Sequence, residues 1–159
     1  MSIFNLTEIL ETTVEYRRLI AATASQSSKV SIQVIDEAVP FLITKLWSDL
    51  KAPVLLICPT PELAERLKER VTGWAEGQIT PLRFVETEAL PFEKITTDTD
   101  TSRTRIEVLN QLSAMSNSPH ILITSVAALA QTTIDLKSFQ NTRQTLRVND
   151  ITSLDHMIE

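Results

Sequence analysis

Glycine is scarce in this chain. Only two of its 159 residues are glycine, Gly73 and Gly77, whereas proteins usually contain about 7% of this residue. The GxxxxGK[ST] pattern, in which a glycine-rich turn presents several backbone N–H groups to phosphates, does not occur. The sequence therefore predicts that the phosphate loop of nucleoside triphosphatases is missing.

Cysteine and long apolar runs are scarce as well. The single cysteine, Cys58, cannot form a disulfide within the chain. The N-terminus lacks the basic and then apolar pattern of a signal peptide, and no apolar run approaches the roughly 20 residues that span a bilayer. We therefore expect a soluble, cytoplasmic protein without a membrane partner.

The sequence also lacks an excess of positive charge. It contains 15 lysines and arginines against 20 aspartates and glutamates, which gives a formal net charge of −5. This balance argues against a general grip on nucleic acid or on an anionic membrane, although it leaves a local basic patch open.

The clearest pattern that is present is a strand followed by a helix in residues 53–74. The unbroken apolar run Val54–Cys58 has the length of a strand and is typical of one that is covered on both faces. Thr60 can cap the following helix, Pro61 suits its first position, and Gly73 is expected to end it.

The same alternation of strand and helix recurs along the chain. Further strands are predicted at residues 30–35, 79–85 and 121–124. Further helices are predicted at residues 5–24, where Asn5 and Glu8 form a capping box, and at 36–50, 102–115 and 125–131. Residues 86–102 and 132–142 read as polar connections. This order predicts an α/β fold with a parallel sheet, flanking helices and right-handed crossovers.

The C-terminal residues indicate a second unit. Residues 143–148 could form one more strand, and residues 153–159 resemble the opening of a helix. We therefore expect one domain in residues 1–142, which includes the N-terminal helix, and the start of a second, truncated domain in residues 143–159. The chain is expected to be a fragment of a longer protein.

Two groups of acidic residues are candidates for metal binding. Asp36 and Glu37 follow an apolar segment, as do the acidic residues with which nucleoside triphosphatases hold a metal and position water. The alternative is that they begin a helix, whose dipole favours negative charge at that end. Asp98 and Asp100 could offer two carboxylates to a divalent cation, or could lie in a solvated loop with helix-capping groups.

Cys58 ends a strand, which is where α/β enzymes often place a nucleophile, and His120 or His156 could serve as its base. The alternative is that Cys58 packs in the core while both histidines lie in loops or on the surface.

Three arginines, Arg83, Arg103 and Arg105, could together bind phosphate. The alternative is that each is a separate, solvated side chain. Taken together, the motifs lead us to expect no catalytic, cofactor-binding or metal-binding residues in this segment.

Four motifs in order resemble a known family. They are residues 53–60, Leu-Pro-Phe-Glu at residues 90–93, the helix of residues 102–112 with its two arginines, and Ile-Thr-Ser-Val-Ala-Ala-Leu-Ala-Gln at residues 123–131. Their order and spacing are similar to those of the N-terminal region of the bacterial transcription-repair coupling factors (Mfd). That region is in turn similar to the damage-recognition protein UvrB.

The resemblance implies a degenerate helicase-like fold, similar to P-loop nucleoside triphosphatases, in which the nucleotide site has been lost. It implies a non-catalytic scaffold domain without cofactors. In the family, the full-length protein is an ATP- and Mg-dependent DNA translocase that displaces stalled RNA polymerase and recruits UvrA for nucleotide excision repair. The arginine- and glycine-rich stretch that contacts UvrA lies in the second domain, and no segment before Glu159 matches it.

Two other classes of function remain open at this stage. The chain could be an active enzyme domain, either helicase-like or a small α/β hydrolase, which nucleotide binding would indicate. It could also be a protein-interaction module of an unrelated multidomain protein.

Overall fold

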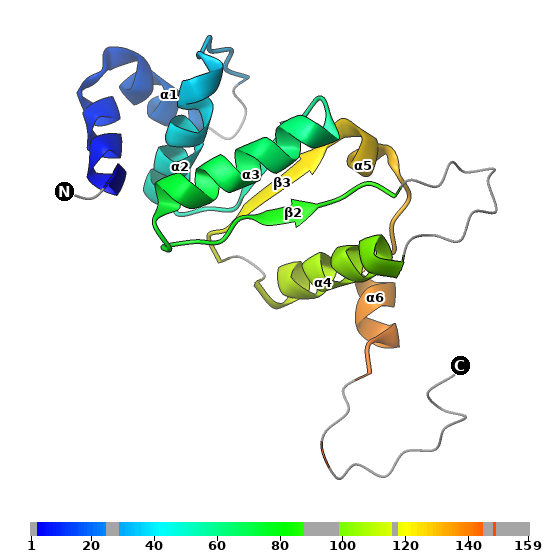
Figure 1. Ribbon diagram of the computed structural model, residues 1–159. Coiled ribbons are helices and arrows are strands. Elements are labelled where there is room, and N and C mark those ends of the chain that lie inside the picture. The colour runs from blue at the N-terminus through cyan, green and yellow to red at the C-terminus, as the bar shows by residue number, and fades with distance from the viewer. Residues whose placement is uncertain (1–2, 25–28, 88–98, 116–117, 145–147, 149–159) are drawn as a thin grey trace.

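The computed structural model describes residues 3–24, 29–87, 99–115, 118–144 and 148. Its centre is a parallel sheet of three strands, β1 (Val54–Cys58), β2 (Leu82–Phe84) and β3 (Ile121–Ser125), in the order β1-β3-β2. Helices flank this sheet, as Figure 1 shows. The predicted α/β class and the parallel sheet are confirmed.

Among the described residues, four helical elements precede β1, one lies between each pair of successive strands, and two follow β3. They are η1 (Ile3–Thr12), α1 (Val14–Ala24), η2 (Asp36–Ala38), α2 (Val39–Leu50), α3 (Pro61–Ala75), α4 (Thr99–Met115), α5 (Val126–Ala130) and α6 (Leu136–Thr142). None of the helices in the described part is long and apolar enough to cross a membrane.

One face of the sheet is covered by α3, with α2 packed beside it. Leu56 and Cys58 of β1 point to this face, where they meet Leu67 and Val71 of α3 and Ile123 of β3. Thr60 caps α3 by accepting a hydrogen bond from the N–H of Leu63 at 3.3 Å, as the sequence predicts. The strand-to-helix unit is therefore the main core of the molecule.

The opposite face of the sheet is covered by α4 and α5. Leu82 and Phe84 of β2 pack there against Val108 of α4 and Ala128 of α5. Ser125 caps α5 by accepting a hydrogen bond from the N–H of Ala128 at 3.0 Å. This second cluster lies over β2 and β3, and the resulting coverage does not extend over β1.

Two predictions about β1 and α3 are wrong. β1 is not covered on both faces, because Leu55 and Ile57 are 52% and 49% exposed. Gly73 does not end α3, which continues to the buried Ala75 and stops where Glu76 and Gly77 adopt positive φ angles of 45° and 79°.

The predicted strand at residues 30–35 is also wrong, because this segment forms no strand in the structure. Its apolar residues alternate, but Val30, Ile32 and Ile35 are all exposed. A strand requires a hydrogen-bonding neighbour, and no described strand lies beside this segment.

The N-terminal helix is interrupted rather than continuous. The backbone N–H and the hydroxyl of Thr13 both donate to the carbonyl of Leu10, and the hydroxyl oxygen accepts a hydrogen bond from the N–H of Tyr16 at 3.3 Å. Thr13 therefore caps α1 as a separate helix. The side chain of Asn5, the predicted cap, lies outside the described residues.

The remaining boundaries differ by a few residues. β2 is shorter than the predicted strand at residues 79–85, and α4 begins at Thr99 rather than at residue 102. The helix α6 replaces part of the predicted polar transition, because Asp135 accepts a hydrogen bond from the N–H of Ser138 at 3.0 Å and caps it. Most of residues 143–159, including the predicted strand and helix, lies outside the described residues.

Candidate functional site

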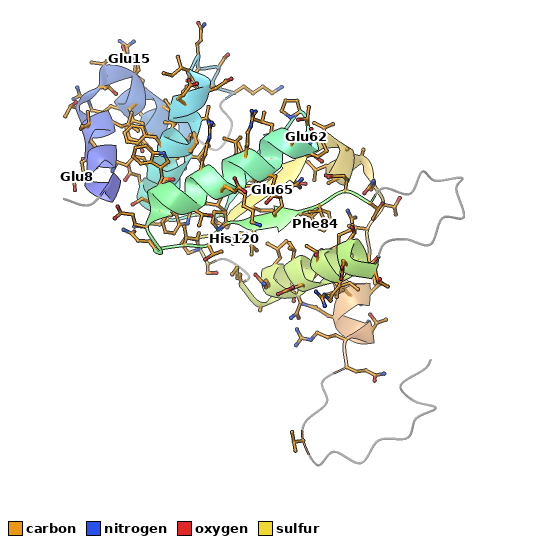
Figure 2. The ribbon with its side chains drawn as sticks, in the orientation of Figure 1. Glu8, Glu15, Glu62, Glu65, Phe84 and His120 are labelled. Atoms are coloured by element: carbon orange, nitrogen blue, oxygen red, sulfur yellow. The ribbon has the colours of Figure 1, made fainter. Side chains whose placement is uncertain are left out.

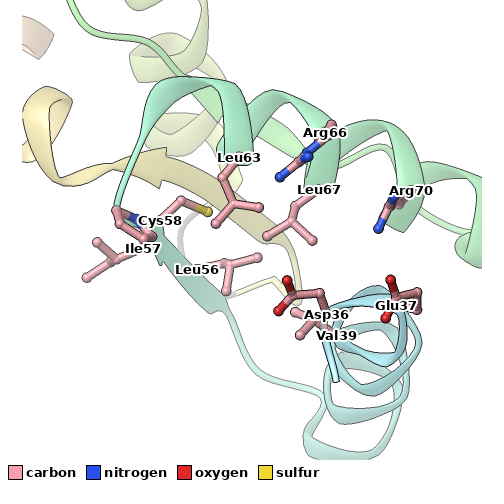
Figure 3. A pocket seen from close by; sticks show the side chains of 11 residues that line it. Asp36, Glu37, Val39, Leu56, Ile57, Cys58, Leu63, Arg66, Leu67 and Arg70 are labelled. Carbon is pink, nitrogen blue, oxygen red and sulfur yellow. The ribbon is translucent and has the colours of Figure 1, made fainter. Parts of the chain in front are cut away.

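A pocket of about 280 Å³ opens at the carboxyl end of β1, between α3 and η2 (Figure 3). Its floor consists of apolar side chains from β1, α2 and α3, and its rim carries two acidic and two basic side chains. The lining residues are Asp36, Glu37, Val39, Leu56, Ile57, Cys58, Pro59, Leu63, Arg66, Leu67 and Arg70. The pocket thus brings Asp36, Glu37 and Cys58, which are candidates from the sequence, to one place.

The helix α3 supplies one wall of this pocket. The Thr60 cap and Pro61 at the first helical position fix where α3 begins. The three- and four-residue spacing then places Leu63 and Leu67 over the sheet, with Arg66 and Arg70 one step further around the helix. Figure 3 shows both arginines above the pocket.

Asp36 and Glu37 supply the opposite rim. Both are exposed and lie in η2, which leads directly into α2. Among the described residues, no ion pair joins them to Arg66 or Arg70. Acidic side chains in a first helical turn are favoured by the helix dipole, but they repel a phosphate from the N–H groups there. The residues of this turn therefore do not fit a nucleotide phosphate.

Cys58 packs in the core, as one of the two interpretations predicts. Its side chain is 1% exposed and contacts the cluster formed by β1, β3 and α3. Burial raises the pKa of the Cys58 thiol, and the positive charge of Arg83 opposes this shift only partly. The thiol is therefore neutral at physiological pH and is a poor nucleophile.

His120 is too far from Cys58 to act as its base. Cys58 pairs with Ser125 at one end of β3, whereas His120 precedes the other end by one residue. Five residues of strand correspond to about 16 Å. Figure 2 shows His120 away from Glu62, which lies in the first turn of α3 just after Cys58. His156 lies outside the described residues.

The three candidate arginines do not form a common patch. Arg103 is exposed, with 81% of its side chain accessible, and its Nη2 lies 3.9 Å from the Oδ1 of Asp100. Arg83 and Arg105 are buried. The interpretation of solvated arginines is therefore right for Arg103 and wrong for the other two.

Carbonyl groups and carboxylates hold the side chain of Arg83, the middle residue of β2. Its guanidinium donates to the carbonyls of Phe84 at 2.6 Å and Pro61 at 3.2 Å. It also forms ion pairs with Glu86 and Glu65, each at 3.5 Å. Glu86 in turn accepts a hydrogen bond from the hydroxyl of Ser125 at 2.8 Å.

Arg105 completes this arrangement from α4. Its guanidinium lies 4.2 Å from the centre of the Phe84 ring and donates to the carbonyl of Val85 at 2.5 Å and to Oε1 of Gln131 at 3.2 Å. Burial lowers the pKa of Arg105, and the charge of Glu86 opposes that shift. Gln131 also bonds to both backbone groups of Thr87.

We refer to Arg83, Glu86, Arg105, Ser125 and Gln131 as the β2 network. Sequence reasoning missed Glu86 and Gln131. The available signal was the position of Arg105 three residues before Val108, on the buried stripe of α4. Ile106, the apolar residue next to Arg105 in the sequence, is by contrast 57% exposed.

The second acidic candidate is described only in part. Asp98 lies outside the described residues, while Asp100 sits in the first turn of α4 and its carbonyl accepts a hydrogen bond from Thr104. Within the described residues, no three His, Cys, Asp or Glu side chains gather as metal ligands would.

Comparisons of the chain with protein-family models, with curated proteins and with solved structures give no match.

Proposed function

We propose that this chain is the N-terminal, non-catalytic scaffold domain of a transcription-repair coupling factor, with a degenerate helicase-like fold. The four sequence motifs and their order support this assignment. In the full-length protein, ATP, Mg, DNA and RNA polymerase would bind to other domains, and UvrA would bind through the second domain, which follows residue 142. The proposed location is the cytoplasm.

The observation that carries the non-catalytic part of the proposal is the turn before α2. A helicase-like domain requires backbone N–H groups that are free to hold phosphates at such a turn. Here Asp36 and Glu37 occupy the turn, and Pro40, which has no N–H, lies in the first turn of α2. Negative charge and a missing donor both disfavour a triphosphate.

Calorimetry with Mg-ATP tests the non-catalytic role. The proposal predicts no saturable heat of binding for the 159-residue chain. Binding with micromolar affinity that is abolished by Asp36→Asn together with Glu37→Gln would contradict it.

A pull-down with UvrA tests the assignment to repair. The chain alone should fail to capture UvrA, whereas the chain extended through the next domain should capture it. Equal capture by both proteins would place the contact within the 159 residues of this chain and contradict this part of the proposal.

The pocket favours one alternative, an active enzyme domain of the helicase-like or small hydrolase class. It gathers carboxylates, arginines and a cysteine at the carboxyl end of a strand, where α/β enzymes bind ligands. The raised pKa of Cys58 and the distant His120 count against a cysteine nucleophile. Turnover of ATP or of a model ester that is lost in Cys58→Ala or Asp36→Asn would favour this alternative.

A further inference from the structure

The pocket at the carboxyl end of β1 carries opposite charges on its two sides. We call Arg66 and Arg70 of α3 the basic rim. Asp36 and Glu37 of η2 lie on the other side and form the acidic rim. All four residues are exposed, and Figure 3 shows the two rims facing each other across the space between α3 and η2. A molecule in this pocket therefore meets positive charge on one side and negative charge on the other.

The basic rim forms no ion pair within the described part of the chain. Glu62 lies four residues before Arg66 and Glu69 lies three residues after it, which are the spacings at which ion pairs form on a helix. The same helix contains such a pair between Lys68 and Glu65 at 3.6 Å, but none that involves an arginine of the rim. The two arginines, four residues apart, also repel each other. Their guanidinium groups are therefore available to an anionic group of a ligand.

The acidic rim likewise forms no ion pair among the described residues. A divalent cation does not fit there, because no third His, Cys, Asp or Glu side chain of the described residues joins the two carboxylates and the basic rim repels a cation. A phosphate does not fit the basic rim alone, because the acidic rim repels it. The pocket therefore disfavours ions that carry charge of a single sign.

The floor between the two rims is apolar. Leu56 of β1 lines it together with Leu63 and Leu67 of α3, and Figure 3 shows the two leucines of α3 pointing down to Leu56. The volume of about 280 Å³ lies just below the range of about 300–1,000 Å³ that is typical of sites for drug-sized ligands. The pocket therefore fits a small molecule with an apolar middle.

We propose that this pocket binds a small zwitterion in which an aliphatic chain separates a carboxylate from an ammonium group. The carboxylate accepts hydrogen bonds from the basic rim, because the planar donors of a guanidinium group match its two oxygens. The ammonium group lies at the acidic rim, and the methylene groups cover Leu56, Leu63 and Leu67. Because the rims lie on opposite sides of the pocket, the two charged groups are at opposite ends of the ligand rather than on one carbon atom.

The test uses the full chain and 6-aminohexanoate, which carries one charge at each end of an aliphatic chain. We expect saturable shifts of the backbone amide signals of Leu56 and Leu67 in NMR spectra. Hexanoate lacks the ammonium group and hexylamine lacks the carboxylate, so each should bind weaker by about tenfold or more. Hexanoate that binds as tightly as 6-aminohexanoate, or a chain that binds none of the three molecules, would overturn the proposal.

Two double variants assign the two ends of the ligand, and all positions changed are exposed, so the fold should be retained. Arg66→Gln with Arg70→Gln should weaken the binding of 6-aminohexanoate about tenfold or more. Asp36→Asn with Glu37→Gln should do the same and should improve the binding of hexanoate. Arg18→Gln is the matched control, because Arg18 is exposed on α1 outside the pocket, and it should change neither affinity. Equal loss in all three variants, or none in any, would contradict the proposed site.

Two sources present this chemistry, a free aminocarboxylate and a lysine at the carboxyl end of a polypeptide. Nα-acetyl-lysine has the charged groups of such a polypeptide end, and its amide lacks the carboxylate. Binding of Nα-acetyl-lysine at least as tight as that of 6-aminohexanoate indicates the polypeptide end, whereas tighter binding of 6-aminohexanoate indicates the free molecule. Saturable binding of the amide with the affinity of Nα-acetyl-lysine would contradict the role of the carboxylate. None of these molecules contains phosphate, so the outcome is independent of the tests with Mg-ATP and UvrA.

Discussion

β2 and β1 are both edge strands of the described sheet, and each pairs with β3 on one side only. Every residue of β2 is buried, because α4 covers it and the β2 network holds Arg83 against the carbonyl of Phe84 and Arg105 against the carbonyl of Val85, just after the strand. In β1, by contrast, Leu55 and Ile57 are half exposed. The comparison teaches that side chains of the chain itself close the β2 edge, whereas within residues 3–24, 29–87, 99–115 and 118–144 nothing pairs with the outer side of β1.

The largest expected effect contrasts the centre of the sheet with its open edge. Ile123→Ala removes a fully buried side chain and should lower the free energy of unfolding by about 4 kcal/mol. Leu55→Ala, at the half-exposed edge, should cost about 1 kcal/mol. Urea denaturation measures both values. Equal losses would mean that the edge is as tightly packed as the centre.

A second contrast tests how β2 is closed. Arg105→Leu leaves the carbonyl of Val85 without its donor and removes the contact with Phe84, and it should lower the free energy of unfolding by about 3 kcal/mol. Arg103→Leu, an exposed position on the same helix, should change it by less than about 0.5 kcal/mol. If the two variants unfold alike, the β2 network does not stabilise this edge.

A smaller effect on the free energy of unfolding concerns α2, which packs beside α3, and it depends on pH. Lys45 of α2 bonds to Glu11 and to Asp49, and Asp49 also accepts a hydrogen bond from Tyr16 at 2.7 Å, which ties η1 and α1 to α2. Burial alone lowers the pKa of Lys45, but the hydrogen bonds and charges of Asp49 and Glu11 outweigh it and raise the pKa above 10.5. Burial and then Asp49 raise the pKa of Tyr16 above 10.0.

Because both pKa values are raised in the folded state, the stabilisation is complete below about pH 10 and is lost as the pH rises through the folded pKa values. We expect unfolding free energy to fall above that pH, with α2 amides exchanging before those of β2. Tyr16→Phe should flatten this decline. A profile in Tyr16→Phe that matches the unmodified chain would exclude Tyr16 as its source.

Local signals in the sequence predicted much of this fold. The apolar strand Val54–Cys58, the Thr60 cap and the amphipathic helices all depend on residues within a few positions of each other, and the structure contains them. Segment 30–35 has the alternation of a strand, but strand formation depends on a distant neighbour. The exposure of Leu55 and Ile57 likewise depends on how far α4 reaches across the sheet.

The sequence identified some residues of the candidate site but not their arrangement in space. Asp36, Glu37 and Cys58 were recognised singly, but their meeting with Arg66 and Arg70 depends on how η2 packs beside α3. The β2 network joins Arg105 to Gln131, which lies 26 positions later, so periodicity within one helix could not reveal the pair.

One matched pair of variants tests the contrast between the edges most directly. Ile57 of β1 and Phe84 of β2 both pair with Thr124 of β3, from opposite sides of the same row. Ile57→Lys should keep the fold and lower the free energy of unfolding by about 1 kcal/mol or less, because the ammonium group reaches water. Phe84→Lys should cost more than about 3 kcal/mol, because it buries a charge in place of the ring. Equal destabilisation by the two lysines in urea denaturation would contradict an open β1 edge.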